Sequence, residues 1–354
     1  MRIAQVAPLF ESVPPRGYGG TERVVAYLTE AQVELGHDVT LFASGDSVSS
    51  ADLVPVCEHG LRAEPAHVAN LWHTLMLDQV FLRTADFDVI HFHTDILHYA
   101  LARRSPVPCL TTLHGRLDSP ELQVLHRHFP DHALVSISDD QRRALPDARF
   151  VATVHHGLPP GLYNFTRKPD DYFVFLGRIS REKRLDRAIE IAVACGTPLV
   201  VAAKVDAADL AYFEREIAHL MRHPLVRFIG EVSDGDKDQL LGNARALLFP
   251  IDWPEPFGMV VIESLACGTP VVAYGHGSVP ELLEHGVTGF VVHDQQGAIE
   301  AARSIDTIDR AACRQAFEER FTSTRMARQY LAVYRSLSQS RRAGAAEITT
   351  ARAK

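Results

Sequence analysis

Runs of apolar residues alternate along the whole chain with segments whose apolar residues recur at the spacing of one helix face. Residues 21–35 are such a helical segment, and Gly36 follows it, as glycine commonly does where a helix ends. The apolar runs of strand length predict strands at Ile3–Ala7, Val39–Ala43, Val89–Phe92, Cys109–Leu113, Leu134–Ile137, Tyr172–Leu176, Leu199–Ala203, Val226–Ile229, Ala246–Phe249, Pro270–Ala273 and Phe290–Val292. Apolar strands separated by helices are typical of parallel sheets that helices cover on both faces.

This pattern stops in the proline- and glycine-rich stretch 155–161 and then starts again. With a length of 354 residues, the chain is expected to form two doubly wound α/β domains of Rossmann type. We place the first domain at 1–160 and the second at 161–324. Residues 314–338 read as one or two amphipathic helices, and the small, polar and basic tail 341–354 is expected to be disordered.

Composition excludes some classes of function. A net charge of −8 argues against a protein that mainly binds nucleic acid, because such proteins need a basic face. The five cysteines form no CxxC pair, which indicates free thiols in a reducing compartment. The N-terminus begins directly with a strand, which argues against a signal peptide, and no apolar stretch is long enough to span a membrane. We expect a cytoplasmic protein, with peripheral membrane contact left open.

Two loops that follow strands could bind an anion. Gly19 and Gly20 lie in a glycine-rich turn before the first helix, where backbone N–H groups can approach a ligand, although an ordinary strand–helix turn would look similar. Arg178 and Lys183 follow the first strand of the second domain, after Gly177. Open α/β sheets bind ligands at this edge, and these cations could hold a diphosphate. A solvated charged turn is the alternative for this loop.

The segment 253–272 carries the most specific pattern. Phe257 and Gly258 open a helix, so that free backbone N–H groups point at whatever lies there. Glu255 ends the loop before them, and Glu263 lies further along an otherwise apolar helix. A carboxylate among apolar residues needs hydrogen-bond donors, which ribose hydroxyls would supply. The alternative is that Glu263 faces solvent.

Taken together, these motifs resemble the retaining glycosyltransferases of family 4, which have the GT-B fold of two Rossmann-like domains facing a deep interdomain cleft. The resemblance rests on the spacing of Glu255 and Glu263, the motif 256–258, the segment 266–270, Gly177-Arg178 with Lys183, and the two N-terminal motifs 19–23 and 112–115. It spans nearly the whole chain. It also implies that a helix at about 325–340 packs back on the first domain.

The resemblance implies roles for individual residues. Arg178 and Lys183 would hold the diphosphate, Glu255 the transferred sugar, Glu263 the ribose, and His114 would lie against the sugar as an active-site residue. The further donor-binding residues that it implies are Gly19, Gly20, Gly177, Val232, Phe257, Gly258 and Met259. Asp95, just after a strand, is the candidate acceptor residue. Two positions depart from the family's pattern: Arg184 stands where glycine is usual, and His156 where asparagine is frequent.

The reaction that follows is transfer of a hexosyl unit from a nucleoside-diphosphate sugar, with UDP favoured by its frequency in the family, without a cofactor or a metal. The sequence Asp234-Gly235-Asp236 imitates a metal-binding DxD, but with Ser233 it reads as the start of a helix. His91 and His93 share one face of a strand without a third ligand nearby. A catalytically inactive nucleotide-sugar-binding protein and a nucleotide-sugar epimerase are the competing interpretations. The acceptor and the oligomeric state are not indicated.

Overall fold

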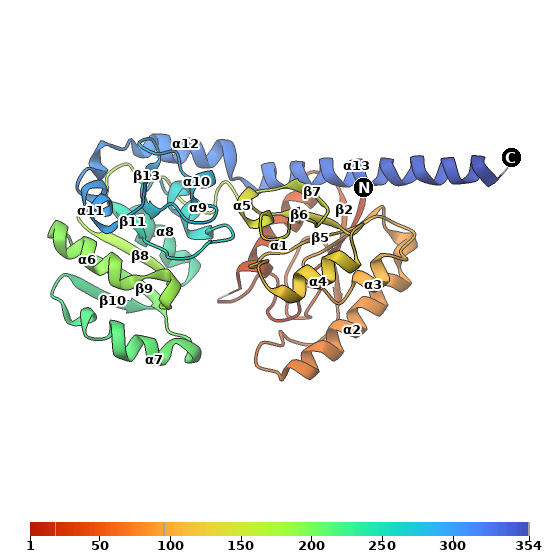
Figure 1. Cartoon of the computed structure of the whole chain (residues 1–354), viewed down its shortest axis with the longest axis horizontal. Coiled ribbons are helices and arrows are strands. Elements are labelled where there is room, and N and C mark those ends of the chain that lie inside the picture. The colour runs from red at the N-terminus through yellow and green to blue at the C-terminus, as the bar shows by residue number, and fades with distance from the viewer. Residues whose placement is uncertain (18, 95, 353–354) are drawn as a thin grey trace. The chain divides into compact units, whose positions relative to one another are not determined.

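The computed structural model describes residues 1–17, 19–94 and 96–352. It divides into two compact units: unit 1 is Met1–Pro159 together with the segment from Ser323 onward, and unit 2 is Pro160–Thr322 (Figure 1). Each unit is built on one parallel sheet with helices between its strands. The expected fold class, two doubly wound α/β domains, is confirmed.

Unit 1 contains a seven-stranded sheet in the order β3-β2-β1-β4-β5-β6-β7. Its strands are β1 (Arg2–Val6), β2 (Asp38–Ala43), β3 (Asp52–Pro55), β4 (Val89–Phe92), β5 (Cys109–Thr112), β6 (Ala133–Ser136) and β7 (Phe150–Thr153). The five inner strands are those that the apolar runs predict. The two edge strands, β3 and β7, are missing from the prediction.

The helices of unit 1 connect these strands and cover the sheet. They are α1 (Gly20–Glu34), α2 (Ala66–Leu82), α3 (Tyr99–Ala102), α4 (Pro120–His128), α5 (Asp139–Arg142) and α13 (Ser323–Arg352), with a 3-10 turn at Thr84–Asp86. The long C-terminal helix α13 packs against α1 (Figure 1). Its Tyr334 hydroxyl lies 2.7 Å from His91 Nδ1 and accepts a hydrogen bond from Gln32, which fixes the helix to the sheet. The helix continues to Arg352, through most of the segment for which the sequence predicts a disordered tail.

Unit 2 contains a six-stranded sheet in the order β10-β9-β8-β11-β12-β13. Its strands are β8 (Phe173–Arg178), β9 (Leu199–Lys204), β10 (Val226–Gly230), β11 (Ala246–Phe249), β12 (Val271–Tyr274) and β13 (Gly289–Val292). Its helices are α6 (Leu185–Cys195), α7 (Leu210–Tyr212), α8 (Asp234–Gly242), α9 (Met259–Ala266), α10 (Val279–Leu282), α11 (Gln295–Arg303) and α12 (Arg310–Arg320). Short 3-10 segments lie at Arg181–Lys183, Ala207–Asp209, Leu220–Arg222 and Ile305–Thr307, and a π-helix at Phe213–Ile217.

Of the inner strands, β4 and β11 are buried along their whole length, and β1, β2 and β9 at all but one residue. Parallel strands buried on both faces are the reason that the chain reads as apolar runs. The carboxyl ends of these strands carry the loops that hold the predicted site residues. In the described part of the chain, none of the helices has the length and apolarity that a membrane span requires.

Candidate functional site

Lys183 and Glu255 come from two separate loops of unit 2, and the structure brings their side chains together. Lys183 ends the 3-10 turn after β8, and Glu255 lies between β11 and α9. Lys183 Nζ makes an ion pair and hydrogen bond with Glu255 Oε2, and the two side chains are only 16% and 12% exposed. The ammonium also lies over the rings of Phe249 (5.5 Å) and Trp253 (5.1 Å). Trp253 Nε1 donates a second hydrogen bond, 2.9 Å long, to Glu255 Oε2.

Arg178 ends β8, at the same edge of the sheet. Its guanidinium is held by two carboxylates, with Glu182 Oε1 at 3.3 Å and Asp206 Oδ2 at 3.6 Å. The side chain is 32% exposed, so a ligand can reach it. Lys204 ends the neighbouring strand β9 in register with Arg178 and shares Asp206 with it, at 3.0 Å. A cationic edge therefore exists here, but each described cation already has a carboxylate partner that an anionic ligand would have to compete with.

The turn before α10 packs against the backbone around Glu255 and holds it in place. Ser278 N–H donates to the Glu255 carbonyl (3.0 Å), and Ser278 Oγ donates to the Phe257 carbonyl (2.6 Å). Gly277 passes so close that a Cβ on it would lie 2.3 Å from Glu255 N. Gly258 follows with a φ of +88° and caps α9, which then begins at Met259. The helix thus begins directly after Phe257 and Gly258, the two residues that are predicted to open it.

Glu263 lies inside α9 and is buried, with a residue exposure of 5%. Its partner is Lys237 of α8, whose Nζ lies 3.7 Å from Glu263 Oε1. The alternative in which Glu263 faces solvent is wrong. Lys237 could not be identified from the sequence, because the spacing between positions 237 and 263 contains no signal that α8 packs beside α9. Val232 is partly exposed and lies between β10 and α8. Gly177 is the second-last residue of β8, directly before Arg178.

The predicted site residues of unit 1 lie after β1 and β5. Gly19 caps α1 and is buried, whereas Gly20 is the exposed first residue of that helix. A Cβ on Gly19 would lie 2.7 Å from the Pro15 side chain, but one on Gly20 would meet nothing within 4 Å. Glycine is therefore needed for packing at position 19, whereas position 20 has room for a side chain. Asp95, the candidate acceptor residue, lies outside the described residues.

His114 belongs to a line of histidines. Its Nε2 lies 2.9 Å from His93 Nδ1, and its Nδ1 lies 3.4 Å from His156 Nε2. His93 Nε2 in turn lies 2.8 Å from Gln5 Oε1. Since an amide oxygen only accepts, His93 donates from Nε2 and accepts at Nδ1, so that neutral His114 donates from Nε2. Burial lowers the pKa of His114 to about 3 and those of His93 and His156 well below their usual value. Both ring nitrogens of His114 are thus already engaged, and sequence analysis missed His93 and His156 as its partners.

Family models match both units. The model described as "Glycosyltransferase Family 4" matches residues 18–138, and the model described as "Glycosyl transferases group 1" matches residues 164–318. The chain belongs to glycosyltransferase family 4.

This glycosyltransferase is similar over nearly its full length to known members. It is 26% identical to a glycogen synthase of Mycobacterium tuberculosis, over 96% of this chain and 96% of that protein. The crystal structure of AviGT4, a glycosyltransferase involved in avilamycin A biosynthesis, superposes with a TM-score of 0.72 at 26% identity and covers 96% of this chain and 98% of AviGT4. HepE of Anabaena, in complex with UDP and glucose, superposes with a TM-score of 0.71 at 18% identity, over 95% of this chain and 100% of HepE. These neighbours establish the GT-B fold of the glycosyltransferase.

In this glycosyltransferase, two sequence patterns resemble metal-binding motifs, the segment 234–236 and the pair His91 and His93, and the structure shows what each of them does. Ser233 caps α8, accepting a hydrogen bond from Asp236 N–H (3.3 Å) while donating to Asp236 Oδ2 (2.6 Å). Residue 236 is therefore part of a helix start, as predicted. His91 and His93 do share one side of β4, with ring centroids 4.0 Å apart. Within the described residues, no group of three or more His, Cys, Asp or Glu side chains is arranged to hold a metal ion.

Proposed function

We propose that the chain transfers a hexosyl unit from a nucleoside-diphosphate sugar, in the first place a UDP-sugar, to its acceptor with retention of configuration at the anomeric carbon. The observation that carries the proposal is the convergence of Arg178, Lys183 and Glu255 at the carboxyl edge of the unit 2 sheet. Cations at this edge suit a diphosphate, and a carboxylate beside them suits sugar hydroxyls. The neighbour HepE has been solved with UDP and with UDP-glucose, which supports the choice of base.

Negative charge develops on the leaving diphosphate as its bond to the anomeric carbon breaks, and the reaction needs protein groups that stabilise this charge. Arg178, Lys183 and the first turn of α9 supply positive charge and N–H donors for that charge. Because Lys183 is engaged with Glu255 in the free protein, a bound diphosphate competes for Lys183. The Glu255 carboxylate is then released to accept hydrogen bonds from sugar hydroxyls, with Trp253 Nε1 still holding one oxygen. Diphosphate binding and sugar recognition are in this way coupled.

Neither a cofactor nor a metal ion has a place in this proposal. The charge of the leaving group is met by side chains and by helix N–H groups, which do this work in other phosphate sites. The retaining outcome is proposed from the family resemblance, with same-face attack guided by the departing diphosphate. An NMR time course of the product anomer, read before mutarotation, would decide it: an inverted product contradicts retention.

Binding of the nucleotide is the first test. UDP, GDP and ADP would be compared by thermal shift, where a ligand at 100 times its Kd adds about 2.7 kcal/mol of stability. Arg178→Ala and Lys183→Ala should each weaken binding of the preferred diphosphate about tenfold or more, since a charge-assisted hydrogen bond is worth about 1.5–3 kcal/mol. Unchanged affinity in both variants would contradict the site. Turnover of a labelled UDP-sugar by the wild type then separates a transferase from an inactive binding protein.

A further inference from the structure

Arg184 has an unusual backbone conformation. In the described part of the chain it is the only residue other than glycine with a positive φ, 54°, and it occupies the cap position of α6. A side chain in this left-handed region costs free energy that glycine would not incur. Outliers of this kind persist where surrounding contacts hold them, and they concentrate at functional sites. The contacts of the Arg184 side chain must therefore offset the cost.

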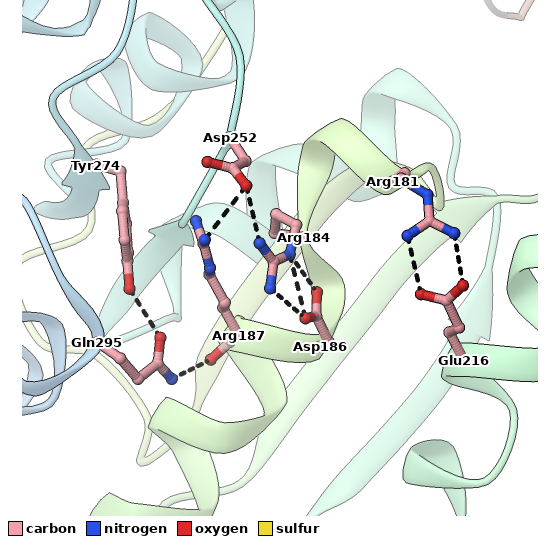
Figure 2. A network of polar contacts seen from close by, with 8 residues as sticks. All are labelled: Arg181, Arg184, Asp186, Arg187, Glu216, Asp252, Tyr274 and Gln295. Atoms are coloured by element: carbon pink, nitrogen blue, oxygen red, sulfur yellow. Dashed lines mark hydrogen bonds and ion pairs between the residues drawn. The ribbon is translucent and has the colours of Figure 1, made fainter.

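Those contacts connect two loops. Arg184 donates to Asp186 from Nε (3.0 Å) and Nη2 (2.7 Å), and to Asp252 Oδ2 from Nη1 (2.9 Å) (Figure 2). Asp186 lies in the first turn of α6, whereas Asp252 lies on the loop between β11 and α9. The Arg184 side chain is 24% exposed and Asp186 25%, whereas Asp252 is 45% exposed, so the Asp186 end of the fork is the better shielded from water. Arg184 thus joins the β8–α6 loop to the β11–α9 loop.

A second arginine anchors the same carboxylate. Arg187 Nη2 lies 3.3 Å from Asp252 Oδ2, and its guanidinium lies over the ring of Tyr274 at 4.9 Å (Figure 2). The Arg187 carbonyl accepts a hydrogen bond from Gln295, which in turn accepts one from the Tyr274 hydroxyl. We call Arg184, Asp186, Arg187 and Asp252 the brace. Through Tyr274 and Gln295 the brace is fixed to β12 and α11.

The two loops joined by the brace are those that carry the proposed donor site. Lys183 immediately precedes Arg184, and Glu255 lies three residues after Asp252. Besides the brace, these loops are connected by the ion pair of Lys183 with Glu255, by the hydrogen bond from Asp252 N–H to the Glu182 carbonyl (2.8 Å), and by the Lys183 ammonium over the Trp253 ring. A bound diphosphate competes for the first of these. The brace, in contrast, does not involve a residue assigned to the donor, so it can persist while the donor is bound.

We infer that Arg184 is a positioning residue that keeps the loop of Lys183 against the loop of Glu255, so that the diphosphate site is formed before the donor arrives. This inference rests on the proposed function and goes beyond it, because it assigns a role to a residue whose side chain is held by Asp186 and Asp252. If the brace is lost, only a fraction of molecules has both loops in place. The apparent affinity for a diphosphate then falls in proportion to that fraction.

The test compares variants of the full chain for affinity to UDP, GDP and ADP by calorimetry, and for thermal midpoint. Arg184→Gly removes the contacts of Arg184 with Asp186 and Asp252, leaves the Arg187–Asp252 ion pair, and also removes the backbone strain. Its thermal midpoint should stay close to that of the wild type, while the Kd for the preferred diphosphate rises about fivefold. Arg184→Lys keeps the charge but lacks the two-pronged fork, and should bind with intermediate affinity. Arg181→Ala is the matched control: it removes a neighbouring arginine paired with Glu216, away from Asp252, and should change neither quantity (Figure 2).

Asp252→Asn distinguishes positioning from direct contact with phosphate. If Arg184 binds phosphate itself, freeing it from Asp252 should tighten diphosphate binding, and that result would overturn the inference. If it positions the loops, Asp252→Asn should weaken binding at least as much as Arg184→Gly, because Arg187 loses its charged partner too, and the double variant should be no weaker than Asp252→Asn alone. The Asp252→Asn variant also keeps the test available if Arg184→Gly fails to fold. Wild-type affinity in Arg184→Gly, with weakened binding in Arg178→Ala, would overturn positioning alone. Wild-type affinity in Arg178→Ala and Lys183→Ala would overturn the proposed function instead.

Discussion

Replacing Lys183 by methionine should destabilise unit 2, because it leaves the carboxylate of Glu255 shielded from water without its cation. Methionine keeps most of the apolar stem of Lys183 and loses the ammonium that pairs with Glu255 and lies over Phe249 and Trp253, so the main change is the lost charge. Glu255→Gln removes the opposite charge and keeps the shape. The double variant contains no unpaired charge at all, and the four proteins together form a thermodynamic cycle.

The exposure of the two side chains sets the magnitude. Exposed ion pairs contribute about 0.2–1 kcal/mol, whereas breaking a fully buried pair costs about 3–5 kcal/mol. At 16% and 12% exposure, Lys183 and Glu255 lie nearer the buried limit. The hydrogen bond from Trp253 Nε1 still satisfies one oxygen in the single variant and lowers the cost. We expect a loss of about 2–3 kcal/mol for Lys183→Met and a coupling energy of about 2 kcal/mol across the cycle.

Trp253 offers the assay, because the chain has only two tryptophans and the other, Trp72, belongs to unit 1. In a Trp72→Phe background, urea unfolding followed by tryptophan fluorescence reports on unit 2 beside the ion pair. The cycle for Arg181 and Glu216, a pair on the surface of the same unit, serves as control and should show coupling close to zero. If the effects of Lys183→Met and Glu255→Gln add within about 0.5 kcal/mol, the reasoning about a shielded, mutually dependent pair is wrong.

Three further outcomes are expected. Gly277→Ala should displace the Glu255 loop and abolish most transfer, since its Cβ would lie 2.3 Å from Glu255 N. Gly286→Ala is the control: this glycine also has a positive φ, but an added Cβ would meet nothing within 4 Å, so only the backbone strain should lower stability. Equal transfer rates in the two variants would contradict this. Acid should destabilise unit 1. The folded pKa of His114 is about 3 and the unfolded one about 6.5, so the unfolded state takes up the proton first, and stability present above pH 6.5 is lost towards pH 3; His114 alone accounts for about 2 kcal/mol of this loss at pH 5, and His132, whose folded pKa is also about 3, adds to it. Urea titrations at pH 7 and 5 would measure this, and His114→Gln should lose correspondingly less. Transfer of labelled sugar should be unchanged by EDTA; loss of activity that Mn²⁺ or Mg²⁺ restores would return attention to the segment 234–236.

The inner strands could be predicted from the sequence because each is buried on both faces and therefore reads as an apolar run. The edge strands β3 and β7 could not. In β3, no residue is buried, and the strand ends in a proline; β7 is half-buried throughout. Such short, partly exposed segments show neither a continuous apolar run nor a clear alternation, and only their pairing with β2 and β6 makes them strands.

The candidate residues at the sheet edge could be predicted from the sequence for a related reason: a cation directly after an apolar strand must lie at the carboxyl edge of a parallel sheet. The side chains that pair with them could not be predicted in the same way. Asp206 reaches Arg178 from the loop after the neighbouring strand, and Lys237 reaches Glu263 from another helix. Strand order and helix packing decide these encounters, and single-sequence periodicity contains neither.

Arg184 shows how a departure from a family pattern changes meaning once its surroundings are known. From the sequence, arginine in place of the usual glycine is a mild change at a helix start. The structure retains the left-handed backbone that suits glycine and adds a fork to Asp186 and Asp252. The backbone at Arg184 still favours glycine, and the side chain connects two loops. The contacts between the loops therefore offset the free-energy cost of the strained backbone. Departures of this kind are informative where the backbone geometry is kept, because the side chain alone must then explain the substitution.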